Sequence, residues 1–302
     1  ATSAAMLAST STSSVPDDVS EEEGSRLSNR TLLSSNEESC SSFDAATTEN
    51  SSSFACIWLT TAFAASNASI AAWVLASRYG LARGFDYYDE VDEELDTLTT
   101  LAERPGQDIT AASLAWLNEN GDKPFFFWAH YFDAHDAYLP PAGFRDFEHP
   151  YDGEVSFVDH QVGQLISWLE TSGNAKDTLV IVVGDHGEDL GQHGEGSHGL
   201  LIYDGTLDIP LLMRMPDRIK PSVIETNVGL IDIPPTICEL VNINTPGEMD
   251  GESLVSALDG IEMDKSRPFF AEGEYSRRSF GWARLRSFVV GDWKLIDSPS
   301  PQ

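Results

Sequence analysis

The spacing of apolar residues predicts alternating strands and helices in the middle of the chain. Between residues 154 and 170 they recur every three or four positions, which predicts an amphipathic helix. The nearly continuous apolar runs at residues 124–132 and 179–184, on either side of that helix, predict strands covered on both faces. This strand, helix, strand order favours a parallel crossover within an α/β sheet.

Shorter patterns extend this prediction in both directions. Further strands are expected at residues 60–65 and 209–213, and further helices at residues 69–78, 109–118 and 234–241. Near the C-terminus, strands are expected at residues 268–271, 283–290 and 293–296, the last two joined as a hairpin near Gly291 and Asp292. The expected fold class is α/β, with a mostly parallel central sheet flanked by helices and a small C-terminal β-rich portion.

The first 53 residues differ in composition from the remainder. Ser and Thr dominate there, Glu21, Glu22 and Glu23 form a run of like charge, and no hydrophobic period persists. We therefore expect residues 1–53 to be a poorly ordered or degraded N-terminal segment. Residues 54–260 are expected to form the α/β core, and residues 261–302 the β-rich portion.

The charge of the chain excludes ordinary nucleic-acid binding. Its 302 residues include 49 Asp and Glu against 18 Lys and Arg, which gives a net charge of −31 and a pI of about 4.3. Such a surface repels phosphate backbones. The few lysines are Lys123, Lys176, Lys220, Lys265 and Lys294. An acidic, lysine-poor surface is typical of proteins that work in concentrated salt, so we expect a halophilic protein. An acidic protein from ordinary salt is the alternative.

Targeting signals and cysteines give little information about the compartment or function of the protein. We expect no membrane span, because no apolar run reaches the length that a bilayer requires. The first residues lack the basic and apolar regions of a signal peptide, and the compartment stays open between cytoplasm and export. Cys40, Cys56 and Cys238 do not form a metal-type pair.

Candidate chemistry is concentrated in one part of the chain. All seven histidines lie between His130 and His198, and polar clusters follow two predicted strands. One contains His135, and the other begins with Asp185 and His186. Because ligands bind beyond the carboxyl ends of strands in α/β sheets, the two clusters are expected to share one crevice. A carboxylate beside an imidazole can hold Ca²⁺, Mg²⁺, Mn²⁺ or Zn²⁺, and Gly187 lets the backbone pass close by. The alternative is an Asp that caps the next helix beside a solvated His.

These segments carry a family resemblance. Residues 185–195 (DHGEDLGQHGE), then 197–199 (SHG) and 203–212 (YDGTLDIPLL), resemble the C-terminal core of the sulfatases, a family of the alkaline phosphatase superfamily. The same family is resembled, in family order, by residues 126–141 (FFWAHYFDAHDAYLPP), 151–155 (YDGEV), 231–236 (IDIPPT) and 291–296 (GDWKLI). The resemblance therefore covers about residues 60–296.

The resemblance implies a hydrolase that cleaves sulfate esters, or in sister families phosphate esters, at one divalent metal ion. Ca²⁺ is the first expectation, with Mg²⁺, Mn²⁺ or Zn²⁺ as alternatives. Asp185 and His186 would be metal ligands, whereas His135 and His198 would be catalytic and contact the leaving-group oxygen or the non-bridging oxygens. His135 would serve as general acid if Asp133 or Asp136 raised its pKa. The implied partner is a small-molecule or polysaccharide ester. Many relatives carry Lys where this chain has His198.

Two family features are missing from the sequence. Relatives begin with a strand that ends in an Asp pair, followed by a nucleophile within Cys/Ser-x-Pro-x-Arg, and neither pattern occurs here. Residues 1–9 faintly resemble the helix that carries the nucleophile, which would make Thr2 or Ser3 its remnant. Two alternatives to a sulfatase therefore stay open. One is a catalytically dead, sulfatase-fold binding protein, and the other is a phosphodiesterase, phosphonate hydrolase or phosphoryl-transfer enzyme of the same superfamily.

Overall fold

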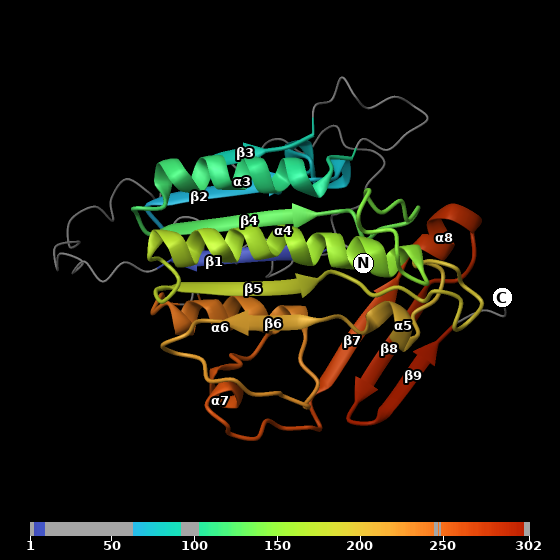
Figure 1. The fold of residues 1–302 in the computed structure, drawn as a ribbon. Coiled ribbons are helices and arrows are strands. Elements are labelled where there is room, and N and C mark those ends of the chain that lie inside the picture. The colour runs from blue at the N-terminus through green and yellow to red at the C-terminus, as the bar shows by residue number, and fades with distance from the viewer. Residues whose placement is uncertain (1–2, 10–62, 92–102, 245–246, 248, 299–302) are drawn as a thin grey trace, which may run out of the picture.

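Two β-sheets form the framework of the protein (Figure 1). The computed structural model describes residues 3–9, 63–91, 103–244, 247 and 249–298. The central sheet has the order β3-β2-β4-β1-β5-β6, and a smaller sheet has the order β7-β8-β9. The strands are β1 (Ser3–Ser9), β2 (Ala65–Ile70), β3 (Tyr87–Asp89), β4 (Phe125–Tyr131), β5 (Thr178–Gly184), β6 (Leu211–Arg214), β7 (Pro268–Gly273), β8 (Leu285–Val290) and β9 (Trp293–Asp297).

Most strands of the central sheet run in one direction. Strand β2 pairs in parallel with β3 and β4, and β1 lies antiparallel between β4 and β5. Strands β4 and β5 therefore run the same way, as the strand, helix, strand pattern predicts. Strand β6 closes the sheet antiparallel to β5. The α/β fold class and the C-terminal β portion are confirmed.

Strand β4 is covered on both faces because its side chains alternate between two cores. Phe125, Phe127, Ala129 and Tyr131 contribute to the core on the side of α3 (Gly106–Asn120) and α4 (Pro150–Ser172), the two helices that cross one face of the sheet in Figure 1. These helices bury, among others, Ile109, Leu117, Leu165 and Leu169. Burial of such side chains contributes roughly 1.5–3 kcal/mol each.

The opposite face of the sheet packs against α6 (Ile233–Leu240). Phe126 of β4 joins Leu179, Ile181 and Val183 of β5 and Ile237 of α6 in a second core. The odd and even positions of β4 and β5 thus point into different cores, which explains their continuous apolar runs. Sheet and helices hold the ends of β4 and β5 rigidly, and both of these strands end at the same edge.

Strand β2 was placed wrongly by sequence reasoning. The strand lies at Ala65–Ile70 rather than at residues 60–65, of which the structure describes only 63–65. In place of the helix expected at residues 69–78 there are two short 3₁₀ segments, η3 (Trp73–Leu75) and η4 (Ser77–Tyr79). The pattern was misleading because β2 buries polar residues. The Ser66 hydroxyl donates to Asp86 at 2.8 Å, which satisfies it inside the protein.

Strand β1 was also not predicted. The faint resemblance of residues 1–9 to a nucleophile-bearing helix is not borne out, because Ser3–Ser9 form a strand in the middle of the sheet. Thr2 and the remainder of the N-terminal segment, residues 10–53, lie outside the described residues. The domain boundaries at residues 53 and 260 therefore stay predictions.

The C-terminal sheet matches the expectation closely. Strands β8 and β9 form the predicted hairpin, and Gly291 in its turn adopts a positive φ of 54°. The remaining helical segments are α5 (Asp204–Leu207), η6 (Leu230–Asp232), α7 (Val255–Leu258) and α8 (Tyr275–Phe280). Among the described residues, no helix combines the length and apolar character that a membrane crossing requires.

Candidate active site

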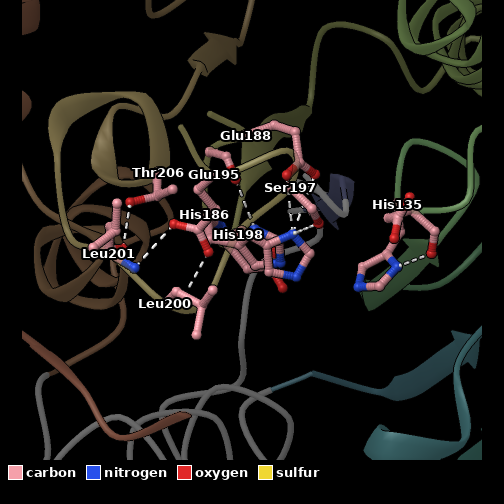
Figure 2. A network of polar contacts seen from close by, with 12 residues as sticks. His135, His186, Glu188, Glu195, Ser197, His198, Leu200, Leu201 and Thr206 are labelled. Carbon is pink, nitrogen blue, oxygen red and sulfur yellow. Dashed lines mark hydrogen bonds and ion pairs between the residues drawn. The ribbon is translucent and has the colours of Figure 1, made fainter. Parts of the chain in front are cut away.

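The loops that follow β4 and β5 meet beyond the carboxyl ends of these strands. The loop after β4 carries His135, and the loop after β5 carries His186 and His198 (Figure 2). The ring centroids of His186 and His198 are 4.1 Å apart, and those of His135 and His198 are 4.8 Å apart. One ring nitrogen from each of the three histidines lies within 4.8 Å of the others. The predicted meeting of the two loops is therefore observed.

Hydrogen bonds fix the protonated nitrogen of each ring. The Nδ1 atom of His135 lies 2.7 Å from the carbonyl oxygen of Asp136, and that of His186 lies 2.9 Å from the carbonyl oxygen of Gly187. Because a carbonyl oxygen can only accept, both Nδ1 atoms must donate. The Nδ1 atom of His198 lies 3.1 Å from a carboxylate oxygen of Glu188, which also accepts. In the neutral tautomer of all three, the Nε2 lone pair is left free.

Burial favours the neutral form of two of these imidazoles, His135 and His198. Burial lowers the pKa of His135, and the neighbouring His186 lowers it further. Burial likewise lowers the pKa of His198, followed by the effect of His186, although Glu188 acts in the opposite direction. The condition under which His135 would serve as general acid, a pKa raised above its usual value by Asp133 or Asp136, is therefore not met. His135 bonds to the backbone of Asp136 rather than to its carboxylate, and desolvation outweighs that bond.

Asp185 lies at the border of this histidine group. Its side chain is 56% exposed, and one carboxylate oxygen accepts a hydrogen bond from the backbone N–H of His186. The same oxygen is 3.8 Å from Nε2 of His186. Asp185 thus lies beside His186, whereas the cluster of ligand atoms within 4.8 Å of one another that the described residues form consists of the three histidines.

Sequence reasoning missed Glu188. Its side chain is 1% exposed and accepts a hydrogen bond from Nδ1 of His198. The hydroxyl oxygen of Ser197 lies 3.2 Å from the same nitrogen. A carboxylate that orients an imidazole is the usual second partner of a metal-binding histidine. The sequence contained only a weak signal for this role, namely a Glu two positions after His186.

Internal hydrogen bonds hold the histidine-bearing loop in place. Glu195 is buried, and its two carboxylate oxygens accept from the backbone N–H groups of Leu200 at 2.6 Å and Leu201 at 2.9 Å (Figure 2). A side chain on Gly187 would clash with the carbonyl oxygen of Gly205 and lie 2.8 Å from that of Asp208. The predicted need for a close backbone approach at Gly187 is confirmed.

His193 is not part of the histidine group. Its Nδ1 atom lies 2.7 Å from a carboxylate oxygen of Asp189, and its ring stacks on Tyr203 with centroids 4.2 Å apart. Hydrogen bonds from His193 lower the pKa of Asp189. This histidine therefore serves the loop itself, whereas His198, five residues later, faces the site.

Comparisons with known proteins identify relatives of this chain. The protein is 34% identical over 154 residues to the uncharacterized sulfatase YidJ of Escherichia coli, covering 50% of this chain and 30% of that protein. It is 31% identical over 162 residues to mouse steryl-sulfatase, covering 48% of this chain and 26% of that protein. The chain thus spans less than a third of the length of these relatives.

Solved structures show the same fold. BT4656, in complex with its substrate D-glucosamine-2-N,6-O-disulfate, superposes with a TM-score of 0.63 at 16% identity, covering 82% of this chain and 73% of that chain. Residues 193–297 match the family described as N-sulphoglucosamine sulphohydrolase, C-terminal. Residues 59–243, more than half of the chain, match the Sulfatase family model. The chain therefore belongs to the sulfatase family.

Proposed function

We propose that this chain carries the metal and anion site of a hydrolase that cleaves sulfate esters. The observation that carries the proposal is the convergence of His135, His186 and His198 from two loops at the ends of β4 and β5. Family membership supports the reaction type, because the family is named for it. The ester is a small molecule or a polysaccharide sulfate.

The residues present fit a divalent metal ion. Asp185 and His186 are assigned as ligands, and the Nδ1 atom of His186 is held by the carbonyl oxygen of Gly187, which leaves its Nε2 free to coordinate. A donor set that includes an imidazole suits Zn²⁺ or Mn²⁺ better than Ca²⁺, which prefers oxygen. A bound ion supplies positive charge to a sulfate oxygen.

His198 and His135 are assigned to the ester oxygens. A neutral imidazole with Nδ1–H engaged must gain a proton at Nε2 before it can donate to an anion. For His198 the carboxylate of Glu188 stabilises that proton, so His198 is suited to the non-bridging oxygens. The ring of His135 lies 6.2 Å from that of His186 and 4.8 Å from that of His198, and His135 is assigned to the leaving-group oxygen.

The proposal is tested on metal-stripped protein with two site variants, one control variant and two substrates. Zn²⁺ and Mn²⁺ are titrated calorimetrically, and hydrolysis of 4-nitrophenyl sulfate and 4-nitrophenyl phosphate is measured on the full-length protein. We expect Asp185→Asn and His186→Ala to weaken metal binding at least roughly tenfold and to abolish hydrolysis. His160→Ala, which removes an exposed histidine on α4, is the matched control and should change neither.

Each outcome separates the candidate functions. Unchanged metal binding and turnover in both site variants would remove the assignment. Metal binding without any hydrolysis would identify a sulfatase-fold binding protein, and a strong preference for the phosphate would identify a phosphoric ester hydrolase.

We further propose that the protein works in concentrated salt. The net charge of −31 and the scarcity of lysine support this. The salt dependence of its thermal stability tests the proposal.

A further inference from the structure

The C-terminal sheet, which lies beside the central sheet with β9 at its edge, has one buried and one exposed face (Figure 1). Along β8 the buried Leu285 and Ser287 alternate with exposed positions, so neighbouring side chains point to opposite sides. In the register of the sheet, Phe270 of β7 lies opposite Phe288, and Phe288 lies opposite Leu295 of β9. Because side chains in one such row share a face, all three lie on the exposed side.

The exposed side of this sheet carries an apolar patch. A second row adds Val290 and Trp293, which are opposite each other in the register and follow Phe288 and precede Leu295 on the same face. The exposed fractions are 83% for Trp293, 69% for Leu295 and 58% for Phe270, and the ring centroids of Phe270 and Phe288 are 6.1 Å apart. We call the patch formed by Phe270, Phe288, Val290, Trp293 and Leu295 the outer face.

The outer face is as large as the apolar part of a protein interface. Side chains of these types and exposed fractions contribute on the order of 100 Å² each, so the five together expose roughly 600 Å². Single apolar side chains on a surface are common, whereas contiguous patches of this size mark interaction sites. A stable interface buries about 800 Å² on each partner, and its centre is apolar. The outer face can supply that centre.

Charge distinguishes the C-terminal portion from the remainder of the chain. Residues 261–302 contain seven Lys and Arg against six Asp and Glu, which gives a net charge of +1, whereas the whole chain carries −31. Residues 1–260 therefore carry −32, and strong repulsion opposes contact between two copies through that part of the chain. Contact through the C-terminal portions instead brings together the parts of two copies that repel each other least.

The charged residues next to the outer face are compatible with contact between identical copies. The row beyond Phe288 consists of Glu272, Arg286 and Asp297, one from each strand. Arg286 lies 2.8 Å from a carboxylate oxygen of Glu272, so this row holds both signs of charge and is partly paired. A two-fold axis places one patch against the same patch of a second copy. A row with both signs can face its own copy, whereas a row of one sign would repel it.

We propose that two copies of this chain form a dimer through their outer faces, by face-to-face packing of the two C-terminal sheets. Sheets pack in this way when each presents an apolar face to the other. The inference goes beyond the hydrolase assignment and does not depend on it, because neither a metal ion nor turnover is involved. Since each copy is strongly acidic outside its C-terminal portion, the dimer should become tighter as salt screens the repulsion.

Sedimentation velocity of the full chain tests the proposal. In about 1 M KCl the protein should change from monomer to dimer as its concentration rises to about 100 µM, and the dimer should be weaker in about 0.1 M KCl. Trp293→Gln should weaken dimerisation at least about tenfold, and Leu295→Gln at least about threefold, because they remove apolar area from the centre of the interface. Leu212→Gln, which removes a leucine 60% exposed on β6 of the central sheet, is the matched control and should leave the dimer unchanged.

Loss of the dimer must be separated from loss of the fold. The replaced side chains are exposed, so the far-UV circular dichroism spectra of all three variants should equal that of the parent protein. A parent protein that stays monomeric at about 100 µM in about 1 M KCl would overturn the inference, whether its outer face is free or covered by another part of its own chain. A dimer that is unchanged in both Trp293→Gln and Leu295→Gln would overturn it as well.

Discussion

Glu188 illustrates how one buried carboxylate determines what an imidazole can do. It accepts from Nδ1 of His198 at 3.1 Å and is almost fully buried, so its charge acts on the ring without solvent between them. The nearby His198 in turn helps to hold the pKa of Glu188 below its usual range against the opposing effect of burial. Glu188 therefore orients His198 and makes its Nε2 atom more basic, which favours the proton that the proposed function places there.

We predict that Glu188→Gln lowers kcat for hydrolysis of 4-nitrophenyl sulfate about tenfold and leaves the affinity for Zn²⁺ unchanged, because glutamine can still accept the hydrogen bond but carries no charge to stabilise a proton on His198. Turnover assays and calorimetric titration of Zn²⁺ measure the two effects, with Glu170→Gln as the matched removal of an exposed charge. Unchanged turnover in Glu188→Gln would contradict the role assigned to Glu188 and His198.

His130 provides a test of pH-dependent stability. It is buried on β4, accepts from the backbone N–H of Ala71, and is approached by Asp185, which favours its protonation, and by His135, which opposes it. Burial dominates and lowers its pKa from 6.5 to about 4. The unfolded chain therefore binds a proton at this site between about pH 6.5 and 4, while the folded chain does not. The stability that neutral His130 contributes is complete above pH 6.5 and is lost as the pH falls.

We predict that His130→Asn, which keeps an acceptor for Ala71 N–H, flattens this dependence. Relative to the variant, the parent protein should lose about 3 kcal/mol of unfolding free energy between about pH 6.5 and pH 4. Urea unfolding at a series of pH values measures both proteins. Parallel pH profiles would mean that His130 is protonated in the folded state.

For the candidate site, the sequence predicted which loops come together, but not the hydrogen bonds that each side chain makes. Asp185, His186, His135 and His198 could be found because they follow strands that end at one edge. The partners of the Nδ1 atoms could not, because two of them are backbone carbonyls. Whether a carbonyl faces a ring depends on the path of the loop, which no residue type encodes.

At the scale of elements, Asp232 joins the α/β core to the C-terminal sheet. It is fully buried at the end of η6, and its carboxylate accepts from the backbone N–H groups of Gly229 at 2.8 Å and Glu252 at 2.9 Å. It also accepts from the guanidinium of Arg267, the residue before β7. Three segments that are distant in sequence thus meet on one side chain.

We predict that Asp232→Ala lowers the free energy of unfolding by about 3 kcal/mol, because it removes the buried carboxylate that pairs with Arg267 and leaves only the longer contact to the exposed Glu252 at 3.4 Å. Denaturant unfolding measures this loss. Asp259→Ala, which breaks the exposed ion pair with Arg218, is the control and should have a much smaller effect. Similar losses in both variants would mean that the buried pair does not stabilise the junction.

Elements were predictable where apolar side chains fill their buried faces. In helix α4 and strands β4 and β5, the spacing of apolar residues shows which faces are buried. Strand β2 does not, because buried Ser66, Asn67 and Ser69 are indistinguishable in sequence from a polar loop. Their burial is possible only because partners such as Asp86 come from elsewhere in the chain.

At the scale of the whole molecule, charge repulsion opposes folding. With a net charge of −31, the folded chain brings many carboxylates close together, and dissolved salt screens them. The ion pairs that the structure describes on the C-terminal sheet, such as Arg286 with Glu272 at 2.8 Å, offset only part of this surplus.

We predict that stability rises with salt. The thermal unfolding midpoint should be several degrees higher in about 1 M KCl, where the Debye length is ~3 Å, than in about 0.1 M KCl, where it is ~10 Å. Differential scanning calorimetry measures the midpoint, with choline chloride to separate screening from specific cation binding. A midpoint that is constant or falls with KCl would contradict adaptation to concentrated salt.

The arrangement of the site depends on the complete sheet. Strands β4 and β5 present their carboxyl ends at one edge although β1 lies between them, and the two loops close the remaining distance. The order of strands followed from the sequence only in part, since nothing in Ser3–Ser9 indicated a central position. The shared crevice could still be predicted, because the common direction of β4 and β5 was sufficient.

The most direct test of this account is the position of a metal ion among the three histidines. A crystal of the full chain grown with Mn²⁺ would be measured for anomalous scattering at the manganese edge. The account predicts one strong peak within bonding distance of His186 and Asp185, next to His135 and His198. A peak elsewhere, or no peak at saturating Mn²⁺ and again at saturating Zn²⁺, would contradict it.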